Sequence, residues 1–451
     1  MNWLLARHER GAFVLRIEDT DVARSATAHE DVLLEDLRWL GLAWDEGPDI
    51  GGPHGPYRQS ERLHLYRAAA DRFVAGGLAY PCYCTDEELA ERRARALAEG
   101  RAPQYDGACR DLTDAERRAR EAEGRRAAIR FRVPAVDVDF RDLVRGEIRF
   151  AAGAVGDFIL LRSDGYSTYN FACVLDDSAM AITHVVRGED HLSNTVRQQL
   201  LYAAIGAAPP EFAHVSLILG PDREKLSKRE GASSTAELRR IGYLPEAVIN
   251  FLALLGWSPE DGREKMTREE LVERFSLERV NRAAAIFDVA KLTWLNGLYI
   301  RERSAEDLYP LAAPYLEAEG IHDRERGVAM LKAVQSEIER ISDLPRVLPP
   351  LTRGDETPEA TEVLAAPRAV EILEAAERAV PAMEEWSGAA FKAAVVKAGA
   401  AAGVRGRDLF MPVRAALTGN VHGPELPLVA EALGRETALE RLRRAIAQRR
   451  T

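Results

Sequence analysis

Short apolar, β-branched runs alternate with helical patterns in the first half of the chain. These runs span residues 13–17, 180–186 and 215–219. Because strands that are apolar throughout are buried on both faces, the runs predict the strands of a parallel sheet. Residues 28–40 and 60–76 carry apolar positions at helical spacing, and a glycine closes each segment, which predicts two helices. The alternation of strands and helices favours an open α/β sheet.

Residues from about 78 to 173 follow a different pattern. The part that begins at Tyr80 is rich in arginine and has little apolar content. A strand is predicted at residues 128–133, and a hairpin at residues 157–162 and 168–171, which turns at Asp164-Gly165. We expect this segment to be an insertion that divides the sheet domain.

The rest of the chain is predicted to be helical. Pro245 is placed to begin a helix that buries Val248, Phe251, Leu252 and Leu255. From about residue 301 onward, alanine-rich amphipathic segments predict an all-α region. No internal repeat of fixed period is present in the sequence.

Length and composition restrict the class of protein. A chain of 451 residues predicts two to four domains, and 46% hydrophobic with 29% charged residues is typical of a globular enzyme. The net charge of −11 neither excludes nor supports RNA binding, which depends on local patches. No apolar run is long enough to span a bilayer, and the first residues lack the layout of a secretory signal. We therefore expect a cytoplasmic protein without a membrane partner.

A group of polar residues follows the predicted strand 180–186. Arg187, Asp190 and His191 come directly after it, and Ser193 or Asn194 can then cap a helix that ends at Gly206. Ligands of open α/β sheets bind beyond the carboxyl ends of the strands. We therefore expect Arg187, Asp190 and His191 to face a ligand.

A second polar group follows the predicted strand 215–219. The loop from Asp222 to Gly231 places Lys225, Lys228 and Arg229 around Ser227. Lysine ammonium groups can follow charge as it shifts between phosphate oxygens, so this loop is suited to a polyphosphate. The alternative is an ordinary solvated loop, and the short basic run alone does not exclude it.

Three of the four cysteines cluster in the predicted insertion. Cys82 and Cys84 are separated by one residue, and Cys109 follows beyond a charged arm. We interpret them as a zinc site, because closely spaced thiolates preorganise two corners of a tetrahedron. Asp111 and Tyr105 are the candidates for the fourth ligand. The alternative is three buried or reactive thiols without metal, and Cys173 is predicted to be a core cysteine.

Two charged clusters carry less information. Glu18, Asp19 and Asp21 form either a charged loop or an acidic cluster at a helix N-terminus. The arginines of residues 441–450 either contact RNA or simply end a helix, where the helix dipole favours them.

Seven motifs together resemble the bacterial glutamyl-tRNA synthetases, a family of class I aminoacyl-tRNA synthetases. The motifs are Arg16-Ile-Glu-Asp-Thr-Asp21, Gly55-Pro-Tyr-Arg-Gln-Ser-Glu-Arg62, Ser163-Asp-Gly-Tyr-Ser-Thr-Tyr169, Arg187-Gly-Glu-Asp-His191, Lys225-Leu-Ser-Lys-Arg229, Phe287-Asp-Val-Ala-Lys-Leu-Thr-Trp-Leu-Asn296 and Arg414-Ala-Ala-Leu-Thr-Gly419. They extend nearly to the C-terminus in the order and spacing of the family. The resemblance implies an α/β Rossmann-like catalytic domain with an inserted α+β domain, followed by all-α C-terminal domains.

The resemblance also implies domain boundaries. The catalytic domain is expected in two parts, residues 1–78, which are incomplete at the N-terminus, and residues 174–235. Residues 79–173 between them are the inserted acceptor-stem-binding domain with the zinc site. Residues 236–300 are a stem-contact region, and residues 301–451 are a helical anticodon-binding domain.

The implied reaction is ATP-dependent attachment of L-glutamate to tRNA-Glu through a glutamyl-adenylate, with Mg²⁺ accompanying ATP. By resemblance, Lys228 stabilises the transferring phosphate with support from Lys225 and Arg229. Ser227, Asp190 and His191 are expected near the nucleotide. For the glutamate, Arg187 pairs with the side-chain carboxylate, Tyr169 shapes the pocket and Glu18 holds the amino group. The motifs leave open whether tRNA-Gln is also charged, and a monomer is expected.

One departure from the family concerns the start of the sequence. The family begins with a strand and a His-Ile-Gly-His-like motif that binds ATP phosphates, whereas Met1-Asn-Trp-Leu-Leu-Ala-Arg7 matches the helix just after that motif. Either the start is placed too far downstream or part of the ATP site is lost. The alternative function is therefore a tRNA-binding protein without ligase activity. A short paralogue that modifies a tRNA base is disfavoured by the helical C-terminal region.

Overall fold

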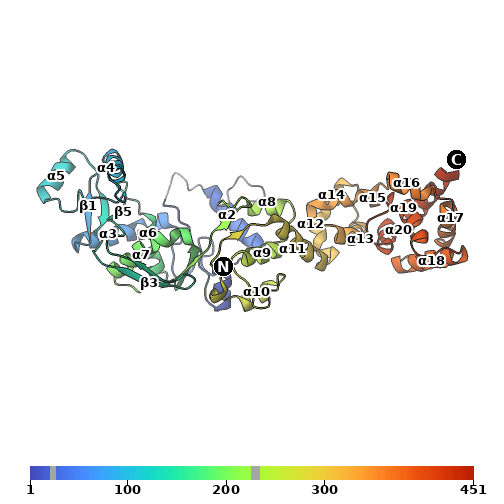
Figure 1. Cartoon of the computed structure of the whole chain (residues 1–451), viewed down its shortest axis with the longest axis horizontal. Helices are drawn as coiled ribbons and strands as arrows, with labels where there is room; N and C mark the ends of the chain where they lie inside the picture. Colours follow the sequence, from blue (N-terminus) through green and yellow to red (C-terminus); the bar gives the residue numbers. More distant parts are fainter. Residues whose placement is uncertain (21–26, 225–233, 451) are drawn as a thin grey trace. The chain divides into compact units, whose positions relative to one another are not determined.

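The computed structural model describes residues 1–20, 27–224 and 234–450 (Figure 1). The chain forms two compact units, one of residues 1–227 and 252–287, and another of residues 228–251 and 288–451. In the described part, no helix is both long and apolar enough to cross a membrane. The division into five segments that is expected from the sequence stays a prediction.

A four-stranded mixed sheet lies in the first unit. Its strands, in spatial order, are β4 (Gly146–Phe150), β3 (Val138–Asp142), β7 (Glu211–Val215) and β6 (His184–Gly188). The β3–β4 pair is antiparallel, whereas β7 pairs in parallel with both β3 and β6. In the β6–β7 ladder Arg187 is the Cα partner of His214. The predicted parallel arrangement is thus confirmed for β6 and its neighbour β7, whereas the sequence analysis did not predict the strand β3.

Three helices and the first sheet build the main core of this unit. The helices are α3 (Leu63–Ala75), α6 (Tyr169–Ala179) and α7 (Leu192–Ile205). Their core includes Tyr66, Phe171, Leu201 and Phe212, each at most 2% exposed. Gly206 has a positive φ of 70° and ends α7, as the sequence predicts.

A separate three-stranded antiparallel sheet carries the cysteine-rich segment. Its order is β1 (Ala79–Cys82), β2 (Ala128–Phe131) and β5 (Phe158–Leu161). The charged helices α4 (Asp86–Ala98) and α5 (Asp114–Ala122) connect β1 to β2 (Figure 1). Capping boxes at Thr85 and Thr113 satisfy the first backbone N–H groups of these helices. Strands β2 and β5 confirm two of the predictions for this segment.

The remaining elements of the first unit are short or peripheral. They are α1 (Asn2–His8), α2 (Thr27–Leu40), η1 (Gln59–Arg62), η2 (Glu189–His191), β8 (Ile218–Leu219), α10 (Arg268–Arg274), η3 (Leu277–Arg279) and β9 (Ala285–Ile286). The parallel pair β8–β9 forms a third, two-stranded sheet.

Three predicted strands differ from the structure. Residues 13–17 make only single bridges, at Val14 with Glu46 and at Ile17 with Arg58. These bridges go to different segments, so no ladder extends beyond one residue. The run 215–219 is divided between β7 and β8 because the chain leaves one sheet after Val215 and joins another.

The third difference concerns the run 180–186, where β6 begins only at His184. Met180 still belongs to the end of α6, since its backbone N–H donates to Asp176 O at 2.7 Å. Ala181 then has a positive φ of 52°, which breaks an extended conformation. An apolar run alone could not separate this helix end from a strand.

Three local predictions are also wrong. The second strand of the predicted hairpin, residues 168–171, is instead the start of α6, and only Ser167 bridges back to Leu161. Ser193 and Asn194 lie inside the first turn of α7, because the preceding 3₁₀ turn η2 leads directly into that helix. Leu252 is 39% exposed, although Val248, one turn earlier on the same side of the helix, is only 2% exposed.

The second unit is entirely helical in its described part, as predicted. Its elements, with one helix shared with the first unit, are α8 (Thr235–Arg240), α9 (Pro245–Gly256), α11 (Val289–Glu302), α12 (Ala305–Ala318), α13 (Arg324–Val334), η4 (Gln335–Glu337), η5 (Ile341–Asp343), α14 (Leu344–Val347), α15 (Pro349–Thr352), α16 (Pro358–Leu364), α17 (Ala369–Ala379), α18 (Gly388–Ala401), α19 (Arg407–Thr418) and α20 (Leu426–Arg450). The last of these, α20, consists of two helical segments that meet at a kink at Gly434, and it packs against α13, α17, α18 and α19 around one apolar core (Figure 1).

Candidate active site

Arg187 stands near the carboxyl end of β6, where its guanidinium group meets neutral hydrogen-bond partners. Its Nη2 donates to Thr195 Oγ1 and Gln198 Oε1, both at 2.7 Å. Its Nη1 lies 3.3 Å from the Tyr169 hydroxyl, and its Nε lies 3.3 Å from His214 Nε2. A guanidinium has five N–H groups, so one on Nη1 is left over. Within the described residues no carboxylate pairs with Arg187, which leaves its charge to an anionic ligand.

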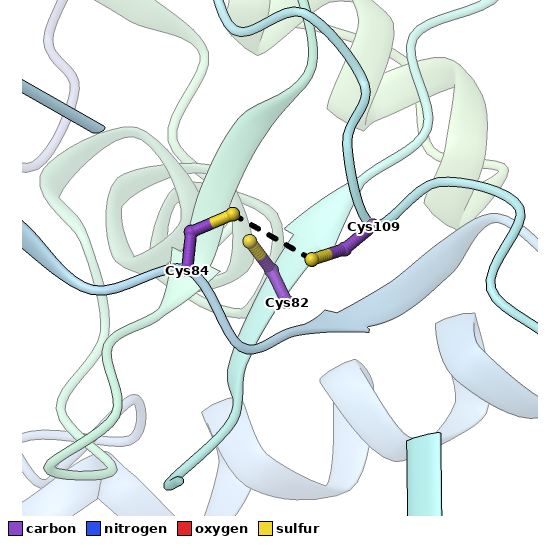
Figure 2. Close-up of side chains that lie close together, drawn as sticks. All are labelled: Cys82, Cys84 and Cys109. Carbon is purple, nitrogen blue, oxygen red and sulfur yellow. Dashed lines mark hydrogen bonds between the residues drawn. The ribbon is translucent and has the colours of Figure 1, made fainter. Parts of the chain in front are cut away.

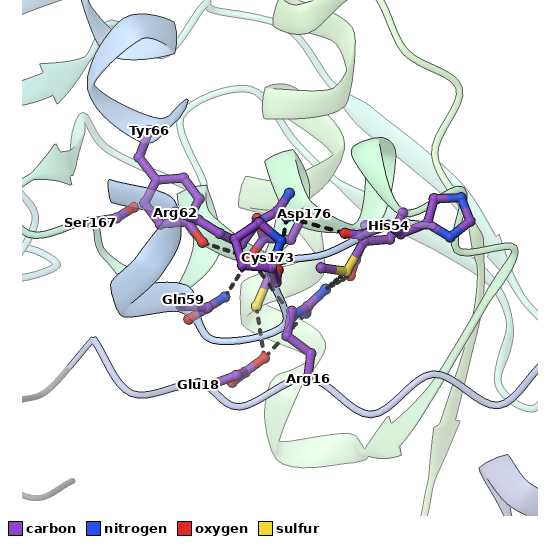
Figure 3. A network of polar contacts seen from close by, with 12 residues as sticks. Arg16, Glu18, His54, Gln59, Arg62, Tyr66, Ser167, Cys173 and Asp176 are labelled. Carbon is purple, nitrogen blue, oxygen red and sulfur yellow. Dashed lines mark hydrogen bonds and ion pairs between the residues drawn. The ribbon is translucent and has the colours of Figure 1, made fainter. Parts of the chain in front are cut away.

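Cys173 connects Glu18 to α6, the helix that begins with Tyr169. Cys173, four residues after Tyr169, shares its helix face and donates from Sγ to Glu18 Oε1 at 3.2 Å (Figure 3). Arg16 Nη2 approaches the same oxygen at 3.3 Å. Burial, together with the nearby Cys173, raises the pKa of Tyr169 to about 12, so its hydroxyl is neutral at pH 7. The sequence-predicted Arg187 and Tyr169 are in contact, and Glu18 is close by.

A buried carboxylate anchors the segments around this site. Asp176 is fully buried and accepts hydrogen bonds from Arg62 Nε at 2.6 Å, Tyr66 Oη at 2.7 Å and Gln59 Nε2 at 3.0 Å (Figure 3). Arg16 Nε lies 3.8 Å from the same group. This network ties the segment that carries Glu18 to α3, η1 and α6.

Sequence reasoning missed most of the residues that support the site. Asp176, Thr195, Gln198 and His214 are each at most 2% exposed. Only His214 offered a signal in the sequence, because it stands between the apolar Ala213 and Val215; Gln198 has the polar neighbours Arg197 and Gln199. Such residues are buried at a cost unless hydrogen-bonded, which is why each has a partner.

The other predicted site residues fall into two groups. His191 lies in η2 with its ring 5.7 Å from the Tyr169 ring, and Asp190 beside it is exposed. The residues predicted for the phosphate loop and one predicted acidic residue lie outside the described residues; they are Lys225, Ser227, Lys228, Arg229 and Asp21.

Three cysteines meet at the end of β1 (Figure 2). The sulfur atoms of Cys82, Cys84 and Cys109 all lie within 4.8 Å of one another, and Cys84 Sγ is 3.6 Å from Cys109 Sγ. Zinc–sulfur bonds of about 2.3 Å place tetrahedral sulfurs roughly 3.8 Å apart, so the separation suits zinc. Hydrogen bonds from Cys109 and Cys84 lower the pKa of Cys82, which favours a thiolate in the cluster.

Tyr105 and Asp111, the two candidates for a fourth ligand, differ in position. The Tyr105 hydroxyl lies 3.5 Å from Cys82 Sγ and 3.6 Å from Cys84 Sγ. The Asp111 side chain is 82% exposed, and its Oδ1 pairs with Arg132 at 3.0 Å. The geometry therefore favours Tyr105 as the residue that completes the cluster. Cys173, predicted to be a core cysteine, is buried at 4% exposure and lies apart from the three.

A cavity of about 500 Å³ extends between Tyr105 and Tyr169. Two arginines, Arg130 and Arg197, and the amide side chain of Asn170 line it as well. The Arg130 guanidinium lies 3.8 Å from the centre of the Tyr105 ring, as in a cation–π contact. The cavity thus combines aromatic, cationic and amide groups.

The arginines of residues 441–450 are engaged within the second unit. Arg441 is 5% exposed and donates to the carbonyls of Pro350 at 3.0 Å and Leu351 at 2.7 Å. Arg449 and Arg450 form ion pairs with glutamates of the same unit. Of the two interpretations of this cluster, the structure supports the one in which it stabilises helices.

The sequence matches two known families. Residues 1–294 match tRNA synthetases class I (E and Q), catalytic domain, and residues 307–446 match an anticodon binding domain. The chain therefore belongs to the class I tRNA synthetases of the E and Q family. The fold class expected from the sequence, an α/β catalytic region followed by helical domains, is confirmed.

Relatives of this family are similar over nearly the whole chain. The chain is 47% identical to the glutamate–tRNA ligase of Heliobacterium modesticaldum, covering 98% of this chain and 92% of that protein. It is also 47% identical to the glutamate–tRNA ligase of Natranaerobius thermophilus, and this similarity covers 99% of this chain and 94% of that protein. The structure is also similar to a crystal structure of a glutamate tRNA ligase from Elizabethkingia meningosepticum in complex with its amino acid. The TM-score is 0.87 at 31% sequence identity, and the similarity covers 99% of this chain and 94% of that chain.

Proposed function

We propose that this chain attaches L-glutamate to tRNA-Glu in an ATP-dependent reaction that passes through a glutamyl-adenylate. Membership of the E and Q family and the names of the relatives support the reaction class. The single observation that supports an acidic substrate is Arg187, whose guanidinium is surrounded by neutral partners within the described residues.

In this proposal the chain contributes positioning and charge. The side-chain carboxylate of glutamate pairs with the free Nη1 edge of Arg187, while Tyr169 borders the pocket and Glu18 holds the amino group. The α-carboxylate oxygen then attacks the α-phosphorus of ATP, forming a carboxyl–phosphate bond as pyrophosphate leaves. A terminal ribose hydroxyl of tRNA next attacks the acyl carbon, and AMP leaves. Such a reaction gains its rate from orientation and electrostatic stabilisation.

The nucleotide site is proposed from the family resemblance. Lys228, supported by Lys225 and Arg229, neutralises charge on the transferring phosphate, and Mg²⁺ accompanies ATP. Ser227, Asp190 and His191 are proposed to lie near the nucleotide, and His191 stands next to Tyr169 in the structure. In this proposal the ATP side of the site lies at the carboxyl ends of the parallel strands, where ligands of open α/β sheets bind.

The tRNA is proposed to bind along both units. The segment 79–173 would contact the acceptor end, and the cavity between Tyr105 and Tyr169 provides aromatic and cationic groups suited to a nucleotide. The segments 236–300 and 301–451 would contact the stem and the anticodon, in keeping with the matched anticodon binding domain.

A structural zinc ion is part of the proposal. Cys82, Cys84 and Cys109 would hold it with Tyr105 as the fourth ligand, because the Tyr105 hydroxyl is close to two of the sulfurs. When bound, zinc would supply a crosslink between β1 and the segment that carries Cys109, which stabilises a small lobe.

A charging assay tests the proposed function. The purified 451-residue chain is incubated with ATP, Mg²⁺ and radiolabelled L-glutamate or L-glutamine, each with tRNA-Glu or tRNA-Gln. Charging of tRNA-Glu with glutamate, dependent on ATP, is the expected result, and the same assay shows whether tRNA-Gln is charged. Binding of tRNA without any charging would overturn the proposal in favour of a binding protein.

A further inference from the structure

Behind Arg187 lies a buried imidazole–carboxylate pair that has no role in the reaction as proposed. His214 on β7 and Asp142 at the end of β3 have fully buried side chains, and His214 Nδ1 lies 2.6 Å from Asp142 Oδ2. The two strands are neighbours in the sheet. A polar pair placed this deeply costs free energy unless it is completely hydrogen-bonded.

The Asp142 carboxylate is held in one orientation by the backbone. Its Oδ1 accepts the N–H groups of Val144 at 2.9 Å and Arg145 at 2.7 Å. Burial acts to raise the pKa of Asp142, but hydrogen bonds from His214 and these amides outweigh it and hold the pKa below its usual value. An ionised carboxylate only accepts, so the proton of the neutral imidazole lies on His214 Nδ1.

The other ring nitrogen, His214 Nε2, is therefore an acceptor. The Thr195 hydroxyl lies 2.9 Å from it and Arg187 Nε lies 3.3 Å from it. The parallel ladder makes this contact possible, because Arg187 and His214 are Cα partners. The carboxylate of Asp142, the imidazole of His214 and the guanidinium of Arg187 thus form a continuous hydrogen-bonded series within one sheet.

We infer that His214, held by Asp142, is a positioning residue that sets the preference of this site for an acidic amino acid. The inference rests on the proposed function, in which Arg187 pairs with the substrate carboxylate. A carboxylate in direct contact with Arg187 would neutralise it, whereas a neutral imidazole accepts its Nε–H and leaves its charge for the ligand. The His214 ring thus orients the Arg187 guanidinium but does not neutralise its positive charge.

Substitution of Asp142 tests this arrangement most directly. In Asp142→Asn the Oδ1 atom, which accepts the backbone N–H groups of Val144, Arg145 and His214, has to remain an oxygen, so the NH₂ group faces His214 Nδ1. The imidazole then carries its proton on Nε2, where it opposes the N–H of Arg187. We expect the KM for glutamate to rise about tenfold or more, as for loss of a hydrogen bond to a charged group. The KM for ATP and the KM for tRNA-Glu should stay within about threefold.

Two substitutions of His214 distinguish its contact with Asp142 from its contact with Arg187. The amide of His214→Asn reaches the position of Nδ1 and keeps a partner for Asp142, but it cannot reach Arg187. The amide of His214→Gln reaches the position of Nε2 and can accept from Arg187. The asparagine variant should therefore raise the KM for glutamate as Asp142→Asn does, and the glutamine variant should keep it within about threefold of wild type.

Charging of tRNA-Glu by the full chain, with thermal unfolding of each variant, decides the matter. A purely structural role predicts effects that follow stability, with both His214 variants equally impaired, and that result would overturn the inference. An unchanged KM for glutamate in folded Asp142→Asn would also overturn it. Arg187→Ala is assayed in parallel. If it leaves the KM for glutamate unchanged, the proposed role of Arg187 fails first, and the inference fails with it.

Discussion

Replacement of Arg187 by alanine is the sharpest test of how this site selects its amino acid. The substitution removes the only cation that contacts Tyr169 in the described part of the site. It also removes the donor of two 2.7 Å hydrogen bonds, to Thr195 and Gln198. Glutamate would then have to bury its side-chain carboxylate without a charged partner.

The expected size of the effect follows from the partial burial of Arg187, to which a bound glutamate would add. Truncating one partner of a buried, hydrogen-bonded charge pair costs about 2 to 5 kcal/mol. At about 1.4 kcal/mol per tenfold, the KM for glutamate should rise by roughly 30-fold to a few thousand-fold. Rejection of glutamine should weaken at the same time, because its neutral amide no longer faces a guanidinium.

The assay measures initial rates of tRNA-Glu charging at saturating ATP and tRNA while glutamate or glutamine is varied. Arg149→Ala is a matched control, since Arg149 lies in the same sheet but is 70% exposed and pairs with Asp137 at the surface. It should change the KM for glutamate less than twofold, because exposed ion pairs contribute about 0 to 1 kcal/mol. Unfolding curves of both variants exclude loss of fold as the cause.

The reasoning is refuted if Arg187→Ala keeps the KM for glutamate within threefold of wild type. It is also refuted if the control shows the same change. In either case another group would have to neutralise the substrate carboxylate.

Three further predictions concern other parts of the molecule. Lys228→Ala should lower the turnover number about 100-fold or more with little change in tRNA affinity, because a cation at the transferring phosphate acts in the transition state; unchanged turnover at saturating ATP would contradict this. Asp176→Asn should lower the free energy of unfolding of the first unit by about 3 to 5 kcal/mol, because Arg62 would remain buried without its anion; a denaturant titration with a loss below about 1 kcal/mol would count against it. Elemental analysis should find about one zinc per chain. Tyr105→Phe should speed the loss of zinc to a chelator, whereas Asp111→Ala should not. Protein that is purified without chelator and holds no zinc would exclude the site.

Much of the architecture was predictable from sequence, because the relevant signals are local. Glycine at position 206 and alternating strand and helix patterns predicted the unit of β6 and α7, and the amphipathic helices after residue 301 were equally clear. The exact limits of strands were not predictable. Met180 and Val215 belong to apolar runs, yet one ends a helix and the other ends a strand, since long-range pairing decides where each run changes its structure.

The candidate site was predicted only in part for the same reason. Arg187 and Tyr169 were identified from motifs, and the structure brings them into contact. Their supporting residues Asp142 and His214 are 72 positions apart in sequence and meet only through the sheet. Periodicity describes one element at a time, so it carries no information about which buried polar groups from different strands become partners.

Backbone alignment between β6 and β7 decides which side chain stands beside Arg187. A slip of one residue would turn the imidazole of His214 to the opposite face of the sheet and put Ala213 or Val215 in its register position. Residues 206–210 connect α7 to β7. On the proposal made above, the choice of amino acid therefore depends on the backbone register of two strands as well as on the side chains that line the pocket.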